Sequence, residues 1–133
     1  MPSHKIVAHF TDGRVLKGTT TNFNDLAPNF LLTPHGAASP QPVVVEMGLL
    51  KALFFVRDFG GNPEHQDDKS FHTGQPYAGR RIEVVFKDGE TLVGSAPTYS
   101  PEMPGFFVFP ADTRSNTLKV FALAGSVKSV RWL

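Results

Sequence analysis

The chain has no cysteine, no long hydrophobic run and almost no excess of charge of one sign. Without cysteine, disulfides and thiolate chemistry are excluded, which fits a reducing compartment. With 13 Lys and Arg residues against 12 Asp and Glu residues, the formal net charge is only +1. The chain as a whole therefore offers no field that would attract nucleic acid or an anionic membrane, and any such binding needs a local patch.

The hydrophobic residues are also distributed in short segments. The longest apolar run, residues 49–56, is interrupted by Lys51 and is far shorter than the stretch of about 20 residues that spans a bilayer. The first strand-like run begins at Lys5, and no basic and apolar leader precedes it. We therefore expect a cytoplasmic protein that makes no contact with a membrane.

What the chain does contain is one pattern written twice, at residues 10–18 and 86–94. In both copies an Asp-Gly pair, Asp12-Gly13 and Asp88-Gly89, separates two runs of alternating apolar residues. This arrangement is the strongest short-range signal for a β-hairpin, because Asp and Gly tolerate the positive φ angles of a two-residue type I′ turn. The sequence thus predicts two equivalent hairpins with type I′ turns.

The similarity extends well beyond the hairpins. An offset of 76 relates the first parts of the two halves without a gap, and an offset of 77 relates their last parts. The offset of 76 pairs Phe10 with Phe86, Gly18 with Gly94 and Phe30 with Phe106, and that of 77 pairs Gly48 with Gly125 and Lys51 with Lys128. Because this period exceeds that of solenoid units, we interpret each copy as a small module.

Each module is predicted to hold five short strands. In the first module they cover residues 5–10, 15–22, 29–33, 43–45 and 50–56. We place the first module at residues 1–56, a connector at 57–80 and the second module at 81–133. In the connector, Asn62 as N-cap and Pro63 as first helical residue predict one short helix to about Lys69. Three aromatic residues favour a connector that is pinned to the surface rather than disordered; they are Phe59, Phe71 and Tyr77.

Five short antiparallel strands in about fifty residues favour a strongly bent, partly open barrel. Gly18 and Gly94 fall inside predicted strands, which indicates a sharp bend or bulge there. Each module resembles the Sm-like barrel of Sm, LSm and Hfq proteins. The resemblance lies in the pattern apolar-x-apolar-x-Asp-Gly, followed by apolar-x-Gly, a turn, an aromatic strand and a closing Val-x-x-Val strand pair. This resemblance covers both modules and implies a mainly β fold of two tandem five-stranded Sm-like or SH3-like barrels.

A second resemblance covers the whole chain. With Phe54 to Asn62 and Gly79 to Ile82 joining the copies, the sequence resembles a family of uncharacterised bacterial proteins that occur alone or appended to signalling domains. That resemblance implies no activity and no site residues.

The Sm-like resemblance also implies where RNA would bind. Sm-like RNA-binding proteins use an Asp and an Asn between the second and third strands, and Asn24, Asp25 and Asn29 match this place in the first module. Those proteins also use a basic residue at the closing turn, whereas neither turn here, at residues 47–49 and 124–126, has one. The pair Arg80-Arg81 resembles the arginine pair of PilZ-type c-di-GMP receptors, but the Asp/Asn-x-Ser-x-x-Gly stretch of that family does not follow.

The sequence contains no motif typical of a catalytic site or a metal site. His65 and His72, with Asp67-Asp68, form the only histidine cluster, and their spacing matches no closed tetrahedral site. No Gly-x-Ser-x-Gly nucleophile elbow occurs. We therefore expect no enzyme, no catalytic residue, no cofactor and no metal.

Neighbouring phenylalanines remain to be explained. Phe54-Phe55 and Phe106-Phe107 place adjacent rings on opposite faces of a strand, so one ring of each pair must leave its own core. We expect these rings to contact the other module; the connector, a protein partner and an unstacked base are the alternatives.

We therefore expect a non-catalytic module that binds a protein, with strand edges that accept another chain or a second copy of this one. Single-stranded RNA binding, with a steep salt dependence, is the alternative. An enzyme or small-ligand receptor would instead show a deep pocket with convergent polar groups. The residues predicted to bind are Phe54, Phe59, Arg80, Arg81, Phe107, Asn24 and Asn29.

Overall fold

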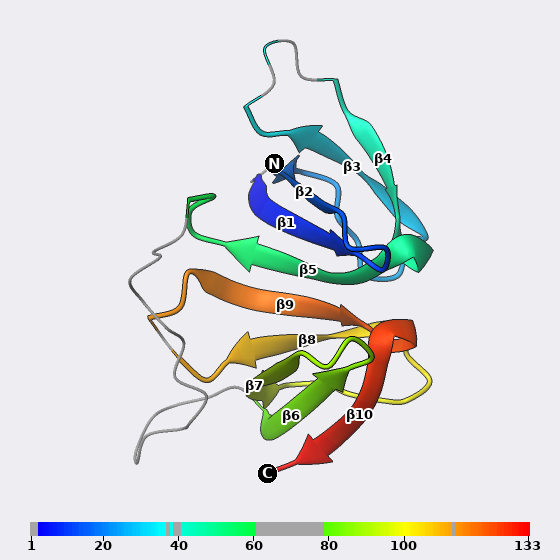
Figure 1. Ribbon diagram of the computed structural model, residues 1–133, viewed down its shortest axis with the longest axis vertical. Helices are drawn as coiled ribbons and strands as arrows, with labels where there is room; N and C mark the ends of the chain where they lie inside the picture. Colours follow the sequence, from blue (N-terminus) through cyan, green and yellow to red (C-terminus); the bar gives the residue numbers. More distant parts are fainter. Residues whose placement is uncertain (1–2, 37, 39–40, 61–78, 113) are drawn as a thin grey trace.

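A computed structural model describes residues 3–36, 38, 41–60, 79–112 and 114–133. These residues form ten strands in one antiparallel sheet (Figure 1). The strands are β1 (His4–Phe10), β2 (Val15–Thr20), β3 (Asn29–Pro34), β4 (Val43–Glu46), β5 (Leu50–Val56), β6 (Arg80–Phe86), β7 (Thr91–Ala96), β8 (Gly105–Pro110), β9 (Thr117–Leu123) and β10 (Val127–Trp132). One-turn 3₁₀ helices, η1 (Met47–Leu49) and η2 (Ala124–Ser126), precede β5 and β10. The predicted mainly β fold is confirmed.

The two halves of the chain build the sheet in the same way. The strand order is β10-β6-β7-β8-β9-β5-β1-β2-β3-β4, so the first strand of each half lies between the fifth and the second. Five strands come from each half, as the sequence predicts. The pairing of β3 with β4 and that of β8 with β9 have corresponding registers, with Leu31 opposite Val44 and Phe107 opposite Phe121.

The Asp-Gly turns form hairpins, but the prediction of type I′ turns is wrong. Such a turn needs a positive φ at both central residues, whereas only the glycines, Gly13 (93°) and Gly89 (95°), have one. The Phe10 amide donates to the Arg14 carbonyl, and the Gly13 amide donates to the Phe10 carbonyl. Each loop therefore has three residues, and Gly alone takes the left-handed conformation.

A sharp bend or a bulge is predicted at the glycines inside β2 and β7, and the described strands have no bulge there. No register shift occurs at Gly18 or Gly94; the shifts in the described pairings lie elsewhere, for example beside Phe10 in β1. A Cβ atom on Gly94 would overlap the Phe109 carbonyl oxygen, and one on Gly18 would overlap that of Thr33. These positions need glycine because the next strand passes directly over them.

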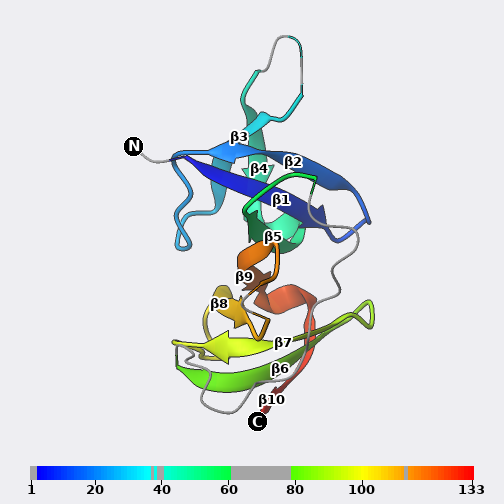
Figure 2. The same cartoon turned by 90° about the vertical axis from the view of Figure 1, so that its left-hand side faces the viewer.

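The halves meet along a β-ladder between β5 and β9, which lie side by side at mid-height in Figure 1 and in the turned view of Figure 2. Ala52 pairs with Ala122, and Leu53 pairs with Phe121. Beyond the ladder, the Arg57 amide donates to the Asn116 carbonyl at 2.9 Å. The ladder makes the two halves one continuous sheet.

Each half curls around its own hydrophobic core, and the ladder exchanges side chains between the cores. Phe121 and Leu123 of β9 belong to the core of the first half, and Ala52 of β5 belongs to that of the second. Phe54 packs against the second core, and Phe107 packs against the first. The predicted contact of these two rings with the opposite half is confirmed.

Residues 61–78 lie outside the described residues. Most of the predicted 57–80 connector lies there, with the predicted helix at 62–69 and the histidines at 65 and 72. The described strand β6 begins at Arg80, one residue before the predicted boundary of the second module.

Candidate functional site

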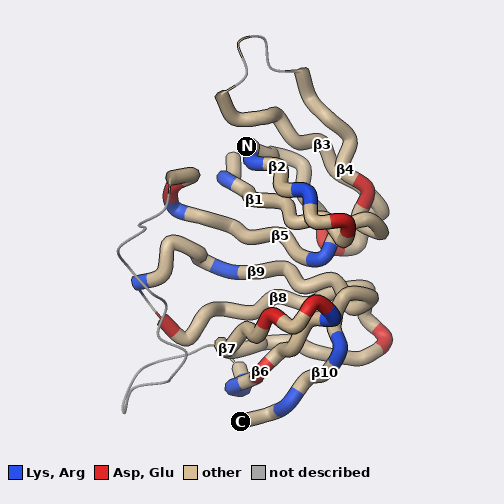
Figure 3. Tube along the Cα trace, in the orientation of Figure 1, with Lys and Arg blue, Asp and Glu red and all other residues tan. Residues whose placement is uncertain are grey.

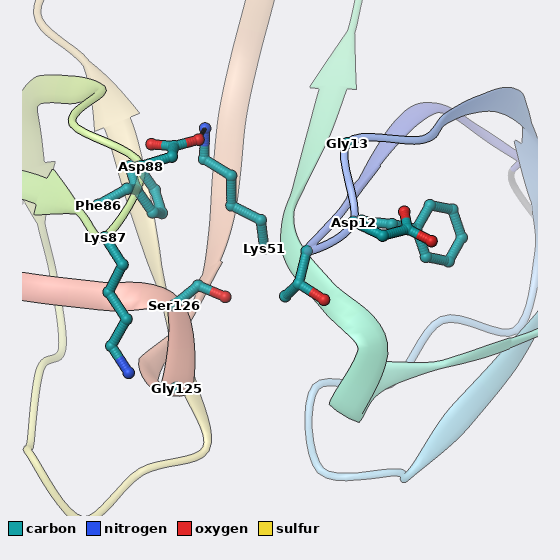
Figure 4. Close-up of a pocket in the computed structure, with 10 residues that line it drawn as sticks. Asp12, Gly13, Lys51, Phe86, Lys87, Asp88, Gly125 and Ser126 are labelled. Atoms are coloured by element: carbon teal, nitrogen blue, oxygen red, sulfur yellow. Dashed lines mark ion pairs between the residues drawn. The ribbon is translucent and has the colours of Figure 1, made fainter.

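A cleft of about 520 Å³ opens where the two hairpin turns face each other across the β5–β9 ladder (Figure 4). The turn that holds Asp12 and Gly13 forms one wall, and the turn that holds Lys87 and Asp88 forms the other. The full lining is Phe10, Thr11, Asp12, Gly13, Lys51, Phe86, Lys87, Asp88, Gly125 and Ser126.

Lys51 of β5 reaches across this cleft from the first half to the second. Its ammonium group forms ion pairs with Asp88, at 2.7 Å, and with Glu90, and it lies 4.8 Å from the centre of the Phe86 ring. Burial lowers the pKa of Lys51, but the hydrogen bonds to both acids outweigh it, so the pKa lies above its ordinary value. The hydrogen bond from Lys51 lowers the pKa of Asp88. Lys51 thus acts as a clamp between the halves.

Asp12 has a local partner instead. Its carboxylate accepts from the Arg14 amide at 3.0 Å and from the Arg14 Nε at 2.8 Å, and these bonds lower its pKa. Behind the cleft, the His9 ring packs on Phe54 at 4.5 Å between centroids. Burial lowers the pKa of His9, and Lys51 adds to this effect while the acids at 88 and 90 oppose it.

Ser126 of the cleft makes a hydrogen bond across the junction of the two halves. The Ser126 hydroxyl donates to the Leu50 carbonyl at 3.2 Å, so no described general base takes its proton. Over the described ranges, no group of three His, Asp or Glu residues is placed to hold a metal ion. Lys51 and Ser126 thus link the two halves at this cleft, whereas Asp12 pairs within its own turn.

A second surface lies on the outer face of β3 and β4, at one end of the sheet. Leu31 and Val44 stand opposite each other on this face and are 45% and 56% exposed. Val43, the preceding residue in β4, lies on the opposite face of the strand, across from Leu32, and is 40% exposed. In the described part of the chain β4 pairs only with β3, so this apolar face adjoins an open strand edge. We call Leu31 and Val44 with this edge the β4 surface.

The corresponding face of the second half is covered by the first half. Phe107 and Phe121 stand in the register positions that correspond to Leu31 and Val44, and Phe121 is 1% exposed. The Phe23 ring lies 5.5 Å from Phe121 and the Phe55 ring 6.0 Å from Phe107, and these two covering rings are themselves 5.4 Å apart. The face is thus buried by the other half of the same chain.

The residues predicted to bind are scattered. Phe54 and Phe107 lie at the junction of the halves, and Phe59 stacks on His35 at 4.2 Å. Arg80 lies over the Trp132 ring at 4.2 Å, and Arg81 is its exposed neighbour in β6.

Asn24, within the β2–β3 loop, and Asn29, the first residue of β3, are both exposed. The side-chain oxygen of Asn24 is engaged by the Leu26 amide at 2.9 Å. Figure 3 shows Lys and Arg positions mixed with Asp and Glu positions over both halves.

The sequence profile of a family of unknown function, DUF6982, matches residues 2–133, which is nearly the whole chain. The chain belongs to DUF6982. No curated protein and no solved structure matches this DUF6982 chain. Within the part of the DUF6982 chain that the structure describes, no helix has the length and hydrophobicity needed to cross a membrane.

Sequence reasoning on this DUF6982 chain missed the β4 surface, because Leu31 and Val44 read as ordinary strand residues. A signal was nevertheless present. At the offsets of 76 and 77, these two residues align with Phe107 and Phe121, so two large aromatic rings of the second half stand where the first half has smaller aliphatic side chains.

Proposed function

We propose that this protein is a non-catalytic module that binds another protein chain at the β4 surface by adding a strand to the sheet. The observation that carries the proposal is a difference in exposure between the β3–β4 face of the first half and the corresponding β8–β9 face of the second half. Phe107 and Phe121 are covered by packed aromatic rings and a paired strand, whereas Leu31 and Val44 are exposed beside an unpaired edge. Open edges with exposed apolar side chains accept an extended segment through backbone hydrogen bonds and side-chain pockets.

We further propose that each half is a partly open Sm-like or SH3-like barrel. The placement of the first strand between the fifth and the second supports this, as does the one-turn helix between the fourth and fifth strands in both halves. The bulge beside Phe10 in the β1–β5 pairing has a counterpart beside Val127 in the β6–β10 pairing. In such a barrel the fourth strand is an edge, which matches the role proposed for β4.

The test is a pull-down from source-cell lysate with three tagged baits: the wild type, Leu31→Asp and Val15→Asp. Val15 is the matched control, because it is 50% exposed on β2, away from the edge. We expect proteins that the wild type and Val15→Asp retain and Leu31→Asp loses, with binding of the recovered protein then measured by titration calorimetry. Recovery that disappears after nuclease treatment would replace the proposal with RNA binding, and equal recovery by all three baits would refute it.

A further inference from the structure

We propose that the pocket between the β2–β3 loop and the β7–β8 loop binds an alkylammonium group, with Asp25 as its anionic partner. The pocket has a volume of about 220 Å³ and lies where the first half meets the second. Asp25 is the part of the lining that comes from the first half, and the second half supplies Pro97, Thr98, Met103, Gly105, Phe106 and Phe107. The pocket shares no residue with the β4 surface, so this inference goes beyond the proposed function.

Among the described acids that are shielded from water, Asp25 alone lacks a partner. Glu83 is half-buried and pairs with Arg131 at 3.2 Å, and the buried Asp112 accepts from the Arg114 amide at 2.8 Å. Asp25 is half-buried as well, yet within the described residues its carboxylate has neither a hydrogen bond nor an ion pair. Shielding a carboxylate from water costs free energy unless a donor compensates for it. The Asp25 carboxylate is therefore available to a cationic donor from outside the chain.

The walls around Asp25 fit the hydrocarbon part and the charge of such a ligand. Phe107 and Met103 are half-buried, and Phe106 is buried. A phenyl ring attracts a cation over its face, and a thioether side chain adapts to the shape of an alkyl group. The Phe107 ring already has one ammonium group over it, that of Lys119 at 4.7 Å, although Lys119 does not line the pocket. An apolar pocket with one carboxylate is thus suited to an ammonium on an alkyl chain.

The charges of the two loops also favour a cation. Residues 21–28 and 97–104 contain two acids, Asp25 and Glu102, and no Lys, Arg or His. The lining of the pocket contains no basic residue either. An anionic ligand would meet an unpaired carboxylate without a counter-charge in the lining, whereas a cation finds an ion-pair partner. The pocket therefore discriminates in favour of positive charge.

Asp25 is held in position by its own loop. The Phe23 ring packs edge to face on Phe121 at 5.5 Å, which anchors the β2–β3 loop to the second half. The Ala27 amide donates to the Asn24 carbonyl at 3.1 Å, and this bond closes a turn that contains Asp25. Because the loop is already anchored and closed, binding requires little ordering of the chain, and the cost in conformational entropy is small.

The internal repeat indicates that the pocket depends on the junction of the halves. At the offset of 76, the counterpart of Asp25 is Pro101, and the counterpart of Phe107 is Leu31. The corresponding loop of the second half therefore has no carboxylate at this position, and the corresponding face of the first half has no aromatic wall. We therefore expect one site per chain, formed only when the two halves pack together.

Binding of simple probes to the purified full chain tests the site, followed by amide chemical shifts in heteronuclear NMR spectra. n-Butylammonium should bind saturably, with a dissociation constant in the millimolar range, because it makes one ion pair and one ring contact. The amide signals of Asp25, Gly105 and Phe107 should shift. n-Butanol, with the same alkyl chain and no charge, should bind about tenfold more weakly, and butyrate should not bind. Absence of saturable shifts with n-butylammonium, or equal binding of n-butanol, would overturn the proposal.

Substitutions separate Asp25 from a general effect of negative charge. Asp25→Asn keeps the size of the side chain and should weaken n-butylammonium binding about tenfold, because a charged acceptor is lost. Glu102→Gln is the matched control: it removes the other acid of the two loops, which is exposed and does not line the pocket, and should leave binding unchanged. Met103→Lys places an ammonium of the chain itself in the pocket and should abolish binding. An Asp25→Asn variant that binds like the wild type would refute the site.

Two further probes distinguish the sources of an alkylammonium group. A lysine with both ends blocked as amides represents a lysine side chain of a protein, and putrescine represents a free amine. Tighter binding of the blocked lysine assigns the pocket to a protein lysine, and tighter binding of putrescine assigns it to a free amine. Either result supports the site if Asp25→Asn weakens it. If neither probe binds, the proposal fails.

Discussion

Val44 and Phe121 hold corresponding register positions on β4 and β9, yet Val44 is 56% exposed and Phe121 is 1% exposed. The difference arises from what covers them. Phe121 lies beneath Phe23 and beside β5, whereas in the described structure β4 has no neighbour on its outer side. One position in the fold is therefore core in one half and surface in the other.

Truncation of these two side chains should accordingly have unequal effects on stability. Phe121→Ala removes a buried ring from the first core and should lower the free energy of unfolding by about 3–5 kcal/mol. Val44→Ala should change it by no more than about 0.5 kcal/mol, as is usual at exposed positions. Urea unfolding followed by circular dichroism measures both values. Equal losses would contradict the unequal burial of the two positions.

Substitution of Gly94 should strongly destabilise the second half of the chain. A Cβ atom there overlaps the Phe109 carbonyl oxygen, so Gly94→Val should unfold the second half, and Gly94→Ala should cost at least about 2 kcal/mol. Gly125→Ala is the control, because a Cβ at Gly125 meets nothing within 4 Å and its φ is not positive. A cost below about 1 kcal/mol for Gly94→Val would show that β8 does not pass closely over this residue.

Lys51→Met should release the clamp between the halves. Without the ammonium group, the pKa of Asp88 should rise toward its ordinary value, which a carboxyl NMR titration reports. A depressed carboxyl pKa adds stability above the unfolded-state value of about 4 and loses it as the pH falls through the folded-state value. Lys51→Met should therefore lose less stability on acidification than the wild type does. Lys87→Met, an exposed lysine at the same cleft, should leave the Asp88 titration unchanged.

His9 should make stability depend on pH in a second range. Burial lowers the pKa of His9 in the folded chain. The neutral ring therefore contributes fully to the free energy of unfolding above the unfolded-state pKa of about 6.5, and this contribution decreases as the pH falls below that value. Melting temperatures between pH 8 and pH 5 should decline less in His9→Gln than in the wild type. His4→Gln, in the same strand, is the control. An identical decline in His9→Gln and the wild type would show that His9 does not titrate differently on folding.

Local signals predicted most of the fold. Short alternating runs predicted the strands, and the pair Asp12-Gly13 with its later copy predicted the hairpins. Strands and hairpins can be predicted in this way because they depend on residues that lie near each other in the sequence. The predicted type I′ turn was wrong because an Asp-Gly pair also fits a three-residue loop, in which only the glycine needs a positive φ.

Long-range pairing was harder to predict. The neighbouring phenylalanines indicated that the halves touch, and Phe54 and Phe107 do cross between the cores. That β5 pairs with β9, in addition to β1 of its own half, depends on contacts between residues 61–70 positions apart that no local pattern encodes. The β4 surface was missed for the same reason, since exposure is decided by which strand has a neighbour.

The shared ladder has a consequence for how this chain is divided. A fragment cut within residues 57–79 would carry either β5 or β9 as a fresh unpaired edge, and would bare the Phe54 or Phe107 ring that its missing half shields. We therefore expect each half to aggregate when it is prepared alone, and the two halves to associate when they are mixed. We also expect the two halves to fold together, because they share the β5–β9 ladder and exchange side chains between their cores.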